Sequence, residues 1–61
     1  MSLQQLNELL NFGKEEFQFF TRELRRSDLT TVERAAINRF RNDLADSLQR
    51  LKERIAERVA G

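Results

Sequence analysis

The feature that most constrains this chain is an uninterrupted helical pattern over its second half, residues 31–59. This stretch has no proline and no glycine, and its apolar residues recur at steps that match one face of a helix. The pattern predicts a single α-helix roughly 44 Å long. Such a helix is stabilised mainly by packing its apolar face, so it needs a partner along its length. The apolar positions are Val32, Ala36, Ile37, Phe40, Leu44, Leu48, Leu51, Ile55 and Val59.

A second helix is predicted before it, over about residues 2–26. Ser2 and Gln5 have the spacing of a capping box, in which each side chain bonds the backbone amide of the other residue. The apolar positions that follow alternate steps of three and four, which is the a/d pattern of a heptad repeat. They are Leu3, Leu6, Leu10, Gly13, Phe17, Phe20 and Leu24.

Gly13 lies on this apolar row and leaves two alternatives open. Glycine costs about 1 kcal/mol relative to alanine inside a helix, so it could break the helix in two. It could instead allow a close helix approach, or make room for a bulky side chain of a partner. The heptad register is the same on both sides of Gly13, which favours one continuous helix.

The connection between the helices is predicted over residues 27–30. Thr30 and Glu33 form a second capping box, which begins a helix over about residues 31–59. A connection this short forces the two helices to lie antiparallel. The predicted fold class is therefore all-α, with one domain over residues 1–61 that forms an antiparallel helical hairpin.

The size of the chain predicts association into a four-helix bundle. A chain of 61 residues buries little core, and without cysteine or histidine it has neither disulfides nor the common zinc sites. Leu9, Phe12 and Phe19 widen the apolar arc of the first helix to about 160°, more than one neighbouring helix covers. We therefore expect a homodimer, and the sequence leaves parallel or antiparallel pairing open. The predicted dimer interface consists of Leu6, Leu10, Phe17, Phe20, Ala36, Phe40, Leu44, Leu48, Leu51 and Ile55.

A second set of residues is predicted to bind a further partner. Phe12 and Phe19 belong either to the dimer core or to an exposed docking patch. Residues 22–41 carry six arginines against three acidic residues, so positive charge gathers at the turn end of the hairpin. This charge could simply favour helix termini and solubility, or it could bind nucleic acid or an acidic protein. The predicted partner-binding residues are Phe12, Phe19, Arg22, Arg25, Arg26 and Arg34.

Composition argues against an enzyme. The chain has no histidine, cysteine or tyrosine, and neighbouring carboxylates such as Glu15 and Glu16 are typical of a solvated helix surface. We expect no catalytic residue, no cofactor and no metal. No apolar run approaches the 18 or so residues of a membrane span, and the lack of cysteine fits a cytoplasmic protein.

These observations predict a small helical homodimer that binds another, unidentified protein as a regulator, inhibitor or adaptor. The alternative is a dimer that binds RNA or DNA through the arginines at the turn end. A third possibility is a subunit that stays unpaired until it meets a larger complex.

Overall fold

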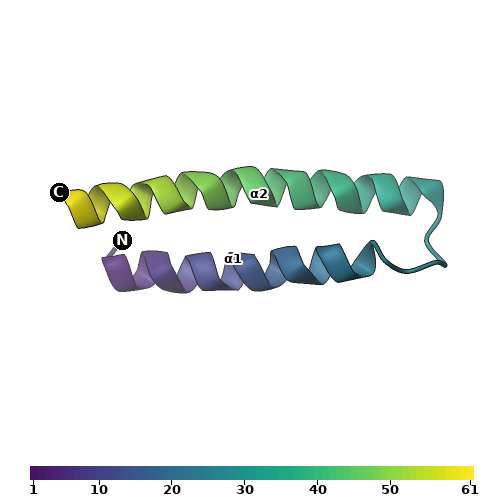
Figure 1. The fold of residues 1–61 in the computed structure, drawn as a ribbon, viewed down its shortest axis with the longest axis horizontal. Helices are drawn as coiled ribbons and strands as arrows, with labels where there is room; N and C mark the ends of the chain where they lie inside the picture. The colour runs from purple at the N-terminus through teal and green to yellow at the C-terminus, as the bar shows by residue number, and fades with distance from the viewer.

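The computed structural model describes residues 1–61 as two α-helices, α1 (Leu3–Glu23) and α2 (Thr31–Ala60). The helices lie side by side and run in opposite directions, joined by a short turn (Figure 1). The molecule measures 47 × 15 × 14 Å, so it is a narrow rod. The predicted antiparallel helical hairpin is confirmed.

Both predicted capping boxes are present, and they determine where the helices begin. At α1, the Gln5 amide N–H donates to Ser2 Oγ at 3.2 Å, and the Ser2 N–H donates to Gln5 Oε1 at 2.8 Å. At α2, the Glu33 N–H donates to Thr30 Oγ1 at 3.1 Å, and the Thr30 N–H donates to Glu33 Oε1 at 3.0 Å. Each box satisfies amide groups that the first helical turn leaves without a partner.

The predicted end of the first helix, near residue 26, was wrong by three residues, because α1 ends at Glu23. After this point the backbone hydrogen bonds join residues three positions apart instead of four. The Arg25 N–H donates to the Arg22 carbonyl, and the Arg26 N–H donates to the Glu23 carbonyl. No residue adopts the left-handed conformation that commonly ends a helix. Two carbonyl groups just past the end of α1, those of Leu24 and Arg26, are instead bound by the side chain of Arg34 from α2.

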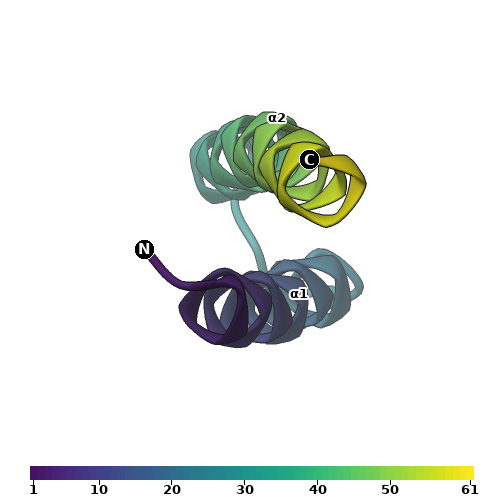
Figure 2. The same cartoon turned by 90° about the vertical axis from the view of Figure 1, so that its left-hand side faces the viewer.

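Gly13 does not break α1, which continues through it as one helix. The residue is buried, and a Cβ atom at this position would overlap the Cδ2 atom of Leu48 on α2. The glycine therefore marks a close approach of the two helices, one of the alternatives that the sequence left open. The end-on view shows the helices crossing at an angle (Figure 2).

The core of the hairpin is thin because two helices can cover each other on one side only. Two of the 61 residues are buried, Leu6 and Gly13, and Leu6 keeps 3% of its surface exposed. The other apolar side chains between the helices are half-buried: Leu10, Phe17, Phe20, Leu24, Ile37, Leu44, Leu48, Leu51 and Ile55. No helix of this chain combines the length and the apolar character needed to cross a bilayer.

Candidate binding surfaces

The first candidate surface is an apolar side of α1 that α2 does not cover. Leu9, Phe12 and Phe19 keep 46%, 58% and 50% of their surface exposed. Phe12 and Phe19 are seven residues apart, so they lie on the same side of the helix, two turns from each other. These are the residues that widen the predicted apolar arc, and the hairpin leaves them uncovered.

On α2, the apolar row divides between the helix contact and the open surface. Phe40 is 60% exposed although its neighbour in the row, Leu44, is half-buried. Val32 and Val59 are exposed because α2 extends beyond α1 at both ends (Figure 1). The row therefore contacts α1 along only part of its length.

A groove of about 450 Å³ lies between these two apolar sides. Its rim carries Glu16 from α1 and, from α2, Arg50 and Arg54. The groove is lined by Leu9, Phe12, Gly13, Glu16, Leu44, Ser47, Leu48, Arg50, Leu51 and Arg54.

Next to the groove, three aromatic rings connect the helices. The rings of Phe19 and Phe20 meet edge to face with centroids 5.7 Å apart, and Phe20 stacks on Phe40 at 6.4 Å. We call the surface formed by Leu9, Phe12, Phe19, Phe40, Leu44 and Leu51 the apolar face.

The predicted interface residues divide between the inside of the hairpin and its surface. Leu6 is covered almost completely within the chain, so little of it is left for a partner. Ala36 and Phe40 are exposed. The other seven are half-buried in the single chain: Leu10, Phe17, Phe20, Leu44, Leu48, Leu51 and Ile55.

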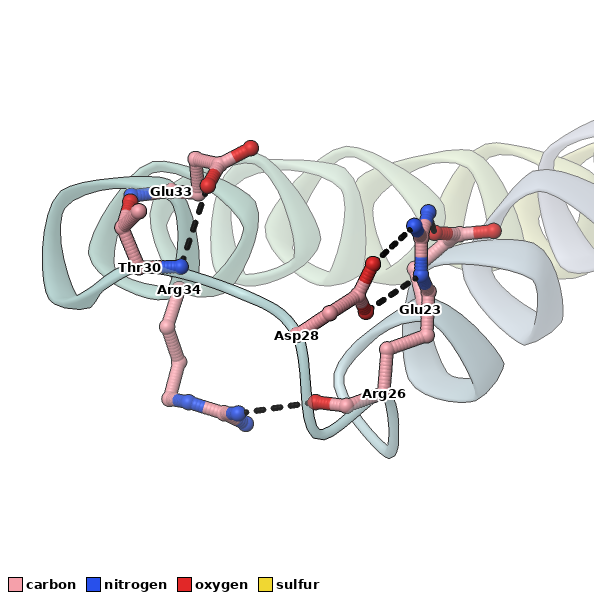
Figure 3. Close-up of polar contacts among 6 residues, drawn as sticks. All are labelled: Glu23, Arg26, Asp28, Thr30, Glu33 and Arg34. Atoms are coloured by element: carbon pink, nitrogen blue, oxygen red, sulfur yellow. Dashed lines mark hydrogen bonds and ion pairs between the residues drawn. The ribbon is translucent and has the colours of Figure 1, made fainter.

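Of the four arginines predicted to bind a partner near the turn, two, Arg26 and Arg34, bind groups of their own chain (Figure 3). Arg34 Nη1 donates to the Leu24 carbonyl at 2.5 Å, and its Nη2 donates to the Arg26 carbonyl at 3.0 Å. The guanidinium thus binds carbonyl groups just past the end of α1, where the helix dipole favours a cation.

Arg26 is occupied by two carboxylates. Its guanidinium bonds Asp28 through two nitrogens, at 2.7 and 3.0 Å, and Glu23 through a third contact at 2.9 Å. The hydrogen bond to Asp28, with a smaller effect of Glu23, raises the pKa of Arg26 further. The same bond lowers the pKa of Asp28. Arg22 and Arg25 make no ion pair and line a separate recess beside Phe17.

Some surface residues lie outside the predicted sets. Arg41 lies over the ring of Phe17, with its guanidinium carbon 5.9 Å from the ring centroid. Lys14 and Lys52, from different helices, line one recess. The sequence signal for these neighbours is weak, because it requires the register between the helices and not only the period of each one.

The chain shows no arrangement of acidic side chains suited to a metal ion, since no group of three or more gathers at one point. The comparisons with known proteins give no relative: no protein-family model, curated protein or solved structure matches this chain.

Proposed function

We propose that this chain is a non-enzymatic binding protein of the cytoplasm that pairs with a second copy through its apolar face. Two hairpins joined in this way form a four-helix bundle. The bundle then acts on another protein as a regulator, inhibitor or adaptor. The observation that carries the proposal is the row of large apolar side chains on one face of a hairpin with only two buried residues.

The surface area of the hairpin supports pairing. A compact monomer of 7.2 kDa has an accessible surface of about 4,100 Å². This chain exposes 4907 Å². The excess is close to the roughly 800 Å² that each partner buries in a protein interface of standard size.

The charges at the groove suit a copy of the same surface. Interfaces around a two-fold axis must be complementary to themselves. Glu16 on the α1 rim and Arg50 and Arg54 on the α2 rim have opposite signs. A two-fold that places α1 of one copy over α2 of the other brings Glu16 toward arginines of the partner, while Phe12 enters the partner's groove.

Nucleic-acid binding by the arginine cluster at the turn has weaker support. Arg26 and Arg34 are held by carboxylates and carbonyl groups of their own chain. Binding phosphate with them would require breaking those bonds. The other alternative is a hairpin that stays monomeric until it joins a larger complex. The mass of the protein in solution distinguishes this monomer from the proposed homodimer.

The test is the mass of the protein in solution. Sedimentation velocity between about 1 and 100 µM should give a dimer, and the melting temperature should rise with protein concentration because dissociation accompanies unfolding. A folded monomer with a melting temperature independent of concentration would reject the proposal.

A matched pair of variants locates the interface. Phe12→Lys places a positive charge on the apolar face beside Arg50 and Arg54 of the groove and should give a monomer, because burying an unpaired cation next to two others is costly. Asn11→Lys adds the same charge at the neighbouring exposed position, which is rotated by about 100° around the helix and does not line the groove. This control should remain a dimer. If both variants dimerise like the natural chain, the apolar face is not the interface.

A further inference from the structure

The side of the hairpin away from the apolar face concentrates positive charge around Phe17 and Gln18. One recess of about 340 Å³ is lined from both helices, with Lys14 on α1 and Lys52 on α2. A neighbouring recess of about 280 Å³ contains Arg22 and Arg25. Both recesses share Phe17 and Gln18, so they form one continuous surface.

Arg41 adds a fifth cation to this surface. Its guanidinium lies over the ring of Phe17, and this contact holds the charge beside the two recesses. Successive helical residues are rotated by about 100°, which places Lys14 and Gln18 across the helix contact from Phe12 and Phe19. We call the surface formed by Lys14, Arg22, Arg25, Arg41 and Lys52 the basic face.

The two recesses of the basic face are lined by no acidic side chain, although the whole chain has a net charge of only +1. The other recesses of the molecule each contain at least one carboxylate, from Glu16, Glu57 or Asp43. The ion pairs of this chain all involve Arg26, so the five cations of the basic face are available to an anion.

The surroundings of these cations fit a phosphate backbone better than unpaired bases. Lys14 and Arg22 are separated by about 12 Å along α1, a length that covers several phosphates of one strand. The amides of Gln18 and Gln49 line the same surface and can donate to phosphate or sugar oxygens. Phe17 is half-buried and covered by Arg41, so it offers no open ring on which a base could stack.

The width of the hairpin favours RNA over DNA. Its cross-section of 15 × 14 Å exceeds the major groove of B-form DNA, which is about 12 Å wide. A-form RNA has a wide, shallow minor groove in which 2′-hydroxyl groups lie beside the phosphates. A broad surface with cations and amides can lie across that groove without entering it.

We propose that the basic face binds double-stranded RNA through its phosphates and 2′-hydroxyl groups, without reading base sequence. Binding at this face does not require the dimer proposed above, because all five cations belong to one chain. In a bundle joined through the apolar faces, both basic faces stay on the outside.

The test is fluorescence anisotropy with a labelled 20-base-pair RNA duplex of arbitrary sequence, and with a DNA duplex of the same sequence. The full chain should bind the RNA duplex at 50 mM salt, and more weakly as salt increases. The DNA duplex should bind less tightly. No binding to the RNA duplex at 50 mM salt would overturn the proposal, and equal affinity for the two duplexes would overturn the assignment to RNA.

Two charge-matched variants separate a specific face from general positive charge. Lys14→Gln with Arg22→Gln should weaken RNA binding by about tenfold and lower the salt dependence by about two phosphate contacts. Arg39→Gln with Arg58→Gln removes the same charge from positions outside the basic face, and binding should change by about twofold or less. If the two double variants weaken RNA binding equally, the basic face is not the binding site. Circular dichroism and sedimentation of each variant verify that fold and oligomeric state are unchanged.

Discussion

The side chain of Leu48 fills the space beside Gly13 in which any other residue would carry its Cβ atom. The two residues lie on opposite helices, at a point where the hairpin is tightly packed. Glycine lowers the helix propensity in the middle of α1, but a larger residue at this position would displace Leu48.

Replacing Gly13 by alanine tests this relationship. In an unhindered helix the change gains about 1 kcal/mol, but here Leu48 must leave its position, which offsets the gain. We expect the gain to be smaller in the natural chain than in a Leu48→Ala background, where the space is empty. Urea unfolding of the four proteins in this cycle, at one protein concentration, measures the coupling. An equal effect in both backgrounds would show that the two sites are independent.

Arg34→Ala should destabilise the hairpin by about 1–3 kcal/mol, because it removes two charge-assisted hydrogen bonds to the Leu24 and Arg26 carbonyl groups. Arg34→Lys should recover part of this loss, since an ammonium cannot fork onto both oxygens. Arg39→Ala, an exposed arginine of the same helix, serves as the control and should change stability by about 0.5 kcal/mol or less. Equal losses for Arg34→Ala and Arg39→Ala would contradict the role of Arg34 at the end of α1.

The protein should lose stability in mild acid through Glu33. The hydrogen bond from the Thr30 backbone amide, followed by the bond to the Thr30 side chain, lowers the pKa of Glu33 in the folded state. Because its pKa is lowered, the Glu33 carboxylate stabilises the fold at every pH above the pKa that it has in the unfolded chain. This stabilisation is lost as the pH falls through the pKa that Glu33 has in the folded chain. The melting temperature should therefore decrease as the pH is lowered below about 5.

Glu33→Gln separates this effect from other acidic groups. The amide oxygen of glutamine can still accept from Thr30, but it does not titrate. We expect the variant to lose less stability than the natural chain between about pH 5 and pH 3. Identical pH profiles would mean that the Glu33 carboxylate contributes nothing to the acid response.

Truncating two neighbouring phenylalanines should have different consequences. Phe17 lies against Arg41 and is half-buried within one chain, so Phe17→Ala should reduce stability by about 2–5 kcal/mol at every protein concentration. Phe19 is 50% exposed on the apolar face, so Phe19→Ala should mainly weaken pairing. Sedimentation equilibrium should show that Phe19→Ala raises the dissociation constant of the dimer by tenfold or more, which corresponds to about 1.4 kcal/mol. An unchanged dissociation constant would remove Phe19 from the interface.

The sequence by itself determined the helices and how they begin. Capping boxes such as that of Thr30 and Glu33 join residues three positions apart, so their geometry follows from local spacing. The short connection then permits only an antiparallel hairpin. The continuity of α1 through Gly13 also agrees with the unbroken heptad register on both sides of it.

Tertiary structure decided where α1 ends, which arginine side chains make no bond to their own chain and which apolar residues remain exposed. Arg34 binds Leu24 from ten positions away, and this contact exists only once the hairpin has closed. The groove beside Phe12 and the recess that Lys14 shares with Lys52 also depend on how the helices cross. The helical period of a sequence gives the direction in which a side chain points around the axis of its helix. The neighbours of that side chain on the other helix are set by all the contacts between the two helices together.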